Sequence, residues 1–218
     1  AYCHIVGDQD QGPGCFLEPL TALSAMARAT SKIGLVSTLS STFYTPFHAA
    51  RMLASLDHIS GGRMGWNVVT SMFDAEARNH GLDAMPSHGE RYARAAEFID
   101  VAVRLWDSWA DDALVMDRAG VYADPDKLQT LHHVGSHFRV EGSLTVPRPP
   151  QGRPVLFQAG ASEQGRDLAG QYAEGIYAVA YDLPSAQDYY ADMKRRIALA
   201  GRNPDNVAIM PGLVTYIG

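Results

Sequence analysis

Hydrophobic and polar positions along this chain follow two alternating patterns. Short runs of β-branched and other apolar residues are separated by longer stretches in which apolar residues recur every three or four positions. The first pattern is typical of buried strands and the second of amphipathic helices. The strands predicted in this way are 33–38, 64–70, 155–158, 175–179 and 206–214, with a further candidate near 2–6.

Helices are predicted between these strands, and capping signals mark their ends. One begins at Thr45, which precedes a proline at the first helical position, and it stops at Gly61. The clearest helix spans 90–109, because its apolar residues fall on a single stripe at helical spacing. Two more are predicted, one from Glu163 and one over about 185–200.

This alternation of strands and helices predicts βαβ units and therefore an α/β fold with a parallel sheet. Right-handed crossovers leave two closures, an open doubly wound sheet or a (β/α)₈ TIM-type barrel. No GxGxxG follows any strand, which weakens the dinucleotide-binding alternative. We favour an incomplete TIM barrel formed by one domain over 1–218, since a full barrel takes about 250 residues.

The polar stretch at about 111–150 interrupts the alternation and is predicted to be an insertion in this domain. It is too long for a passive connection, and its composition indicates local structure such as a small hairpin. The adjacent His132 and His133 have no carboxylate or cysteine at ligand spacing, so no metal site is predicted.

Composition narrows the classes of partner. The net charge is −6 and hydrophobic residues make up 46% of the chain, which is ordinary for a globular protein and argues against nucleic acid as a partner. The small basic cluster 194–196 is interpreted as a solvated helix face. Cys3 and Cys15 form no disulfide framework. No apolar run of about 18 residues predicts a membrane span, so we expect a cytoplasmic location.

Four segments carry a specific resemblance. They are 38–44 (TLSSTFY), 55–71 (SLDHISGGRMGWNVVTS), 88–92 (HGERY) and 158–165 (QAGASEQG). In these segments the chain resembles the bacterial-luciferase-like flavin monooxygenases, the family that includes nitrilotriacetate, dibenzothiophene-sulfone and long-chain alkane monooxygenases. The resemblance runs from about residue 18 to the C-terminus, and the 17-residue block 55–71 is far more specific than a short motif.

The resemblance implies an enzyme and its cofactor. Members of this family are about twice as long, so the chain is expected to correspond to the second to seventh barrel strands and to lack the first and last. The implied activity is that of a two-component monooxygenase, which uses reduced FMN (FMNH2) and O2 to insert one oxygen atom into a small organic substrate. Aminopolycarboxylates, sulfones or sulfonates, and alkanes are the substrate classes among relatives. An NAD(P)H:flavin reductase is the implied partner, and a homodimer or homotetramer the implied assembly.

The same resemblance implies a set of flavin-binding residues. Thr38, at the predicted end of a strand, and Asn67, in an otherwise apolar strand, are expected at the polar edge of the flavin ring. His88 and Tyr92 lie four residues apart on one helix face, and they match positions that reach the ribityl chain and phosphate.

A phosphate site is expected where a strand leads into a helix. A helix amino end offers free backbone N–H groups and a favourable dipole to an anion. The residues predicted there are Gly160, Ala161, Ser162 and Glu163. Asp8 is a further predicted flavin contact. Met72 stands where some alkane-oxidising relatives carry histidine, so no catalytic acid or base is predicted.

Two other functions stay open. One is a deazaflavin (F420)-dependent oxidoreductase on the same barrel, which the block 55–71 argues against. The other is a non-catalytic flavin-binding protein or a degenerate fragment whose barrel does not close.

Overall fold

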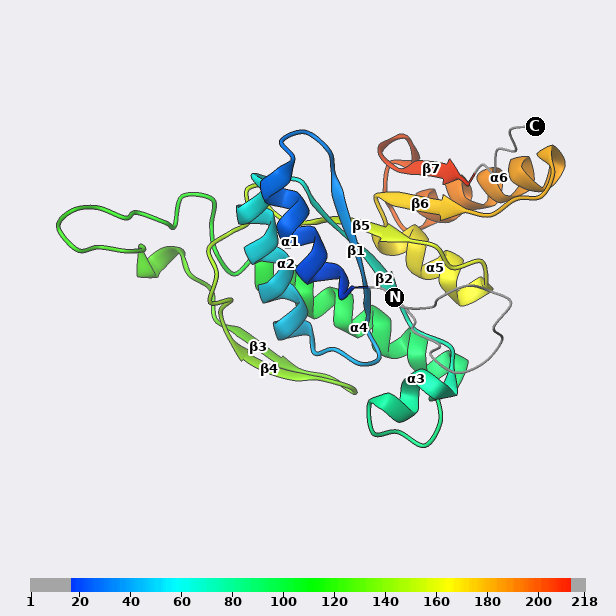
Figure 1. The fold of residues 1–218 in the computed structure, drawn as a ribbon, viewed down its shortest axis with the longest axis horizontal. Helices are drawn as coiled ribbons and strands as arrows, with labels where there is room; N and C mark the ends of the chain where they lie inside the picture. Colours follow the sequence, from blue (N-terminus) through cyan, green and yellow to red (C-terminus); the bar gives the residue numbers. More distant parts are fainter. Residues whose placement is uncertain (1–16, 213–218) are drawn as a thin grey trace.

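The computed structural model describes residues 17–212, and a five-stranded parallel sheet lies at its centre (Figure 1). Its strands follow one another in chain order, and each pairs in parallel with the next. They are β1 (Leu35–Ser40), β2 (Met64–Val69), β5 (Val155–Gln158), β6 (Gly175–Ala178) and β7 (Ala208–Pro211). The prediction of βαβ units and a parallel sheet is confirmed. The candidate strand near 2–6, both cysteines and Asp8 lie outside the described residues.

Helices follow the strands and cover one face of the sheet. The longer ones are α1 (Pro19–Ala29), α2 (Pro46–Ser60), α4 (His88–Trp106), α5 (Glu163–Tyr172) and α6 (Leu183–Leu199). Residues 17–212 also include three short helices, α3 (Asp74–Asn79), η2 (Pro125–Lys127) and η3 (Pro204–Asn206). The start of α2 after Thr45 and its end at Gly61, which is in the left-handed conformation, are confirmed.

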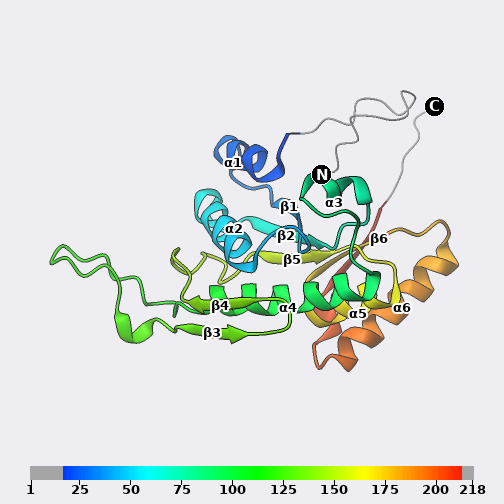
Figure 2. The same cartoon turned by 90° about the horizontal axis from the view of Figure 1, so that it is seen from below.

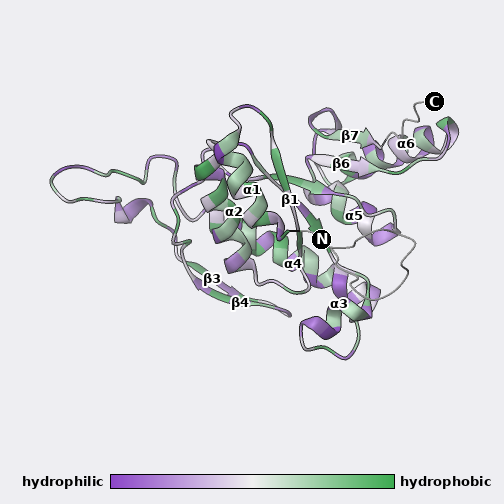
Figure 3. Cartoon of the chain, in the orientation of Figure 1, coloured by the Kyte–Doolittle hydropathy of each residue, from purple (hydrophilic) through white to green (hydrophobic). Residues whose placement is uncertain are grey.

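The hydrophobic core lies between the sheet and these helices. Trp66 of β2 is fully buried, with its ring centroid 5.6 Å from that of Phe98 and 6.2 Å from that of Trp106, both on α4. The Trp106 indole N–H donates to the Ala50 carbonyl of α2 at 3.0 Å. Both helices therefore pack on the same face of the sheet, and the prediction that Trp66 is a packing residue is confirmed. Figure 3 shows hydrophobic residues concentrated along the central strands.

The opposite face of the sheet carries a mixed row of side chains. Thr38, Asn67, Phe157 and Gly175 are register partners on successive strands. The Phe157 ring lies over the glycines beside it: a Cβ added to Gly65 would come within 3.0 Å of this ring, and one added to Gly175 would overlap it. Alternation along each strand thus separates an apolar face from a face that holds polar groups.

Three predicted boundaries need correction. Strand β7 runs over Ala208–Pro211 rather than 206–214, because Asn206 still belongs to the short helix η3. Strand β1 runs over Leu35–Ser40 rather than 33–38, so Thr38 lies two residues before the strand end. The cause is Arg63, whose guanidinium donates to the carbonyls of Ile33 and Thr30 and holds that segment in a loop. Helix α4 spans 88–106 rather than 90–109, because Ser87 caps its amino end.

The segment 111–150 contains an antiparallel hairpin, as predicted. Strand β3 (Leu131–Val134) pairs with β4 (Arg139–Gly142), and β3 contacts α4 (Figure 2). Glu97 of α4 accepts three hydrogen bonds from the hairpin, from His133 Nε2 at 2.9 Å and from the backbone N–H groups of His137 and Phe138 at 3.0 Å. Burial would raise the pKa of Glu97, but these hydrogen bonds outweigh it and lower the pKa.

The paired histidines face different partners. His133 forms a hydrogen bond to Glu97 through Nε2 and one to Arg104 through Nδ1. His132 Nδ1 lies 3.4 Å from Glu141 Oε1. Among residues 17–212, no group of three or more His, Cys, Asp or Glu side chains is arranged to hold a metal ion. The helices within that range include none that is long and apolar enough to cross a membrane.

We predict that Glu97→Gln weakens the attachment of the hairpin to α4. An amide nitrogen in place of Oε2 would face the His137 N–H, so one part-buried hydrogen bond is lost and two donors oppose each other, at a cost of about 1–3 kcal/mol in the free energy of unfolding. Urea denaturation above pH 5 measures it. The contribution shrinks as the pH falls through the lowered pKa of Glu97. The matched control is Glu141→Gln on the exposed side of the hairpin; an equal loss there would contradict this account.

Candidate functional site

A pocket of about 280 Å³ opens at the carboxyl ends of β1 and β2. In parallel α/β folds this edge of the sheet is where ligands bind. Its lining includes Thr38, Ser40, Phe43, Val69, Glu76 and His80. The rings of Phe43 and His80 stack with centroids 4.1 Å apart and form one wall.

Thr38 and Asn67 form a polar pair on the face opposite the helices. They are register partners, and Asn67 Nδ2 donates to Thr38 Oγ1 at 3.1 Å. Both side chains are half-buried. The bond leaves the Thr38 hydroxyl hydrogen and the Asn67 carbonyl oxygen available to a ligand, and the pair can therefore donate and accept at once.

A hydrogen-bonded chain next to this pair was not predicted from the sequence. Ser40 and Ser71 hydroxyls lie 2.7 Å apart, and Ser71 donates to Glu76 Oε1 at 3.0 Å. Ser71 has a φ of 57°, which costs a non-glycine residue about 1–3 kcal/mol, and Arg91 donates to its carbonyl. The available signal was the polar TS that ends the block 55–71, since polar residues at strand ends face a barrel's site.

Glu76 is a partly buried carboxyl group in the lining of the pocket, and its pKa is raised. Burial raises its pKa, and the hydrogen bond from Ser71 offsets only part of that effect. Its other oxygen, Oε2, is buried without a partner. The carboxylate is thus a group that protonates more readily than an exposed glutamate, at the wall of the pocket.

His88 and Tyr92 begin α4 with their rings together, at a centroid distance of 4.7 Å. The Tyr92 hydroxyl approaches α5, since a Cβ added to Gly165 would lie 3.0 Å from it. The structure therefore brings the predicted pair on α4 beside the predicted phosphate loop.

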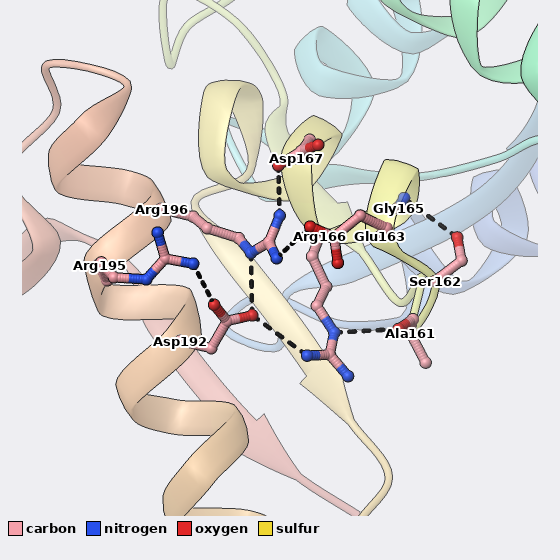
Figure 4. Close-up of polar contacts among 9 residues, drawn as sticks. All are labelled: Ala161, Ser162, Glu163, Gly165, Arg166, Asp167, Asp192, Arg195 and Arg196. Atoms are coloured by element: carbon pink, nitrogen blue, oxygen red, sulfur yellow. Dashed lines mark hydrogen bonds and ion pairs between the residues drawn. The ribbon is translucent and has the colours of Figure 1, made fainter.

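The loop from β5 into α5 is shaped by glycine and by a serine cap (Figure 4). Ser162 Oγ accepts from the Gly165 N–H at 3.2 Å, which confirms Ser162 as the helix cap. A Cβ on Gly160 would lie 2.9 Å from the Gly165 Cα, so a larger residue would push the loop away from the helix. The Glu163 side chain pairs with Arg196, at 2.6 Å between Oε1 and Nη2.

These groups fit one elongated ligand with a polar ring and a phosphate. The polar pair on β1 and β2 can hold ring carbonyl and N–H groups. The glycine cradle and the amino end of α5, which follows the neighbouring strand β5, suit an anion. Met72 is exposed and takes part in neither group.

Comparisons with known proteins agree with the resemblance in the sequence. Residues 5–218 match the family model described as luciferase-like monooxygenase. Nitrilotriacetate monooxygenase component A of Aminobacter aminovorans is 48% identical over 94% of this chain and 46% of its own length. Dibenzothiophene-sulfone monooxygenase of Rhodococcus erythropolis is 46% identical over 93% of this chain and 45% of its own length. A structure of riboflavin lyase with modified FMN and riboflavin has a TM-score of 0.87 at 37% identity, covering 90% of this chain and 44% of that one. The chain spans less than half the length of these relatives.

We predict that Glu76→Gln changes how stability depends on pH. Because the folded pKa of Glu76 is above its unfolded value, its favourable contribution is full at low pH and is lost as the pH rises through the folded pKa. The free energy of unfolding of the variant should therefore rise relative to wild type between about pH 4 and pH 8. Urea denaturation across that range measures it, with the exposed Asp83→Asn as control. A difference that does not vary with pH would show that Glu76 is not perturbed.

Proposed function

The chain belongs to the luciferase-like monooxygenase family, and from that membership and the geometry of the pocket we propose that it acts as the oxygenase of a two-component, FMNH2-dependent monooxygenase. The observation that carries the proposal is the shared edge of the sheet. The Thr38–Asn67 pair lies on β1 and β2, and the cradle at Gly160 follows the neighbouring strand β5. The pair is suited to a flavin ring and the cradle to its phosphate.

Each predicted residue has a role toward FMN. Thr38 and Asn67 hold the polar edge of the ring and fix its orientation, while His88 and Tyr92 contact the ribityl chain and phosphate. The loop residues Gly160, Ala161, Ser162 and Glu163 offer backbone N–H groups to the phosphate. The predicted contact of Asp8 belongs to the same proposal.

The cofactor supplies the reaction of reduced flavin with O2, and the protein supplies position and exclusion of water. One oxygen atom enters a small organic substrate and the other leaves as water. The stacked Phe43 and His80 rings and Val69 line the pocket next to Thr38. Ser40 and Glu76, which are joined through Ser71, line the same pocket.

Reduced flavin must come from another protein, and an NAD(P)H:flavin reductase is the proposed partner. The name of the Aminobacter relative, component A, supports a system of more than one component. The substrate belongs to the small organic compounds that relatives in this family oxidise, and a homodimer or homotetramer is the proposed assembly.

The first test compares flavins in the absence of oxygen. Titration of reduced FMN, oxidised FMN and F420, followed by absorbance and protein fluorescence, should show preferential binding of reduced FMN. Admission of O2 should then reoxidise the bound flavin. Tight binding of F420 with none of FMN would replace the proposal by a deazaflavin oxidoreductase, and binding of neither would favour a non-catalytic barrel.

We predict that Gly160→Ala weakens FMN binding by about tenfold or more, because the added methyl collides with the Gly165 Cα and moves the loop. Isothermal titration calorimetry measures the affinity. The control is Gly34→Ala at the other end of β1, where an added Cβ would come no closer than 4.0 Å to a neighbour. Unchanged FMN affinity in Gly160→Ala would show that the phosphate does not bind at this loop.

A further inference from the structure

Side chains of helix α6 form ion pairs with helix α5, which begins directly after the loop that is proposed to bind phosphate. Three arginines and three carboxylates join α5 to α6 in one network, which comprises Glu163, Arg166, Asp167, Asp192, Arg195 and Arg196 (Figure 4). The interpretation of 194–196 as a solvated helix face is wrong for Arg196, whose side chain is only 11% exposed. Its neighbour Arg195 remains 57% exposed.

We propose that Arg196 is a positioning residue for the phosphate of FMN, because it neutralises the carboxylates that α5 carries in its first turns. This inference rests on the proposed function. Arg196 pairs with Glu163 at 2.6 Å, with Asp167, and through Nε with Asp192 at 2.9 Å. All of these contacts come from one side chain of α6.

The electrostatic reason lies in the position of the two carboxylates on α5. Glu163 is the first residue of the helix and Asp167 the fifth, so both stand close to the amino end that is offered to an anion. A phosphate monoester carries between one and two negative charges at neutral pH, and carboxylates close to it repel it. The side chains of Glu163 and Asp167 are 70% and 56% exposed, so solvent screens part of that repulsion. Pairing with the largely buried Arg196 reduces the rest, while the carboxylates keep their favourable interaction with the helix dipole.

A second arm of the network fixes the loop itself. Asp192 accepts from Arg166 Nη1 at 3.1 Å, and Arg166 Nε donates to the Ala161 carbonyl at 3.0 Å. Because a peptide unit is planar, holding the Ala161 carbonyl also fixes the N–H of Ser162, which points the opposite way. The Arg166 guanidinium lies 5.1 Å from the Tyr189 ring, which limits its movement.

Asp192 and Arg196 keep their charges across the physiological range. Burial would raise the pKa of Asp192, but hydrogen bonds from Arg195, Arg196 and Arg166 outweigh it and lower the pKa to about 2. The hydrogen bond to Glu163 raises the pKa of Arg196, and those to Asp192 and Asp167 add to this effect. The ion pair between Asp192 and Arg196 is therefore kept as the pH changes within that range.

The test compares FMN with riboflavin, which has the same ring and ribityl chain but no phosphate. We expect Arg196→Met to lower FMN affinity about tenfold and riboflavin affinity less than about twofold, as measured by calorimetry. Adding Glu163→Gln to that variant should restore part of the FMN affinity. The control Arg28→Met removes an equal charge from an exposed position of α1, outside the network, and should change neither affinity by more than about twofold.

Each other outcome has a definite meaning. Equal losses for both flavins, or no loss for either, would overturn the role of Arg196 while leaving the proposed function intact. If the wild-type protein binds riboflavin as tightly as FMN, the loop is not a phosphate site. If it binds neither flavin, the proposed function is overturned too. If thermal melting shows that Arg196→Met does not fold, Glu163→Gln alone serves. It leaves Arg196 with less negative charge to pair, so FMN affinity must rise relative to riboflavin; an unchanged ratio contradicts the inference.

Discussion

Adjacent residues of β2 point to opposite faces of the sheet, and both the core and the site depend on that alternation. Trp66 packs between Phe98 and Trp106 of α4, whereas Asn67 donates to Thr38 on β1. A shift of one residue in register would bury the amide under a helix and expose the indole. The packing of Trp66 therefore holds the amide at its place on the other face.

Electrostatics add a second constraint, on α5. The proposed anion site at the amino end of that helix calls for its carboxylates to be paired. The pairing comes from α6, the helix that follows the next strand, so the proposed phosphate loop depends on the packing of two successive βα units. This dependence ties the binding of a ligand to the integrity of the sheet between β5 and β6.

Much of this arrangement is readable from the sequence, because periodicity and capping are local. Strand β5 and the start of α5 were predicted at the right residues, and the glycine–serine loop indicated an anion site. The block 55–71 and HGERY identified the family. Sequence patterns did not predict α1, whose cap is the carboxylate of Glu18 rather than a common capping residue, or α3, which has only six residues.

Other features depend on partners far away along the chain. The offset of β1 results from Arg63, nearly thirty residues later, and the Ser71–Ser40 contact joins two strands. A run of basic residues on a helix is usually solvated, and only the packing of α6 on α5 turns Arg196 inward. Such contacts have no local signal, since they arise from the register and packing of elements that the sequence specifies separately.

Amide hydrogen exchange with and without FMN tests the central claim most directly, since it locates the flavin without assuming a reaction. The account predicts that FMN slows exchange in 160–165 and at the start of α4, with a smaller effect near Thr38 and Asn67, and that riboflavin protects the strands but not the loop. Protection confined to other parts of the chain, or none at all, would contradict it.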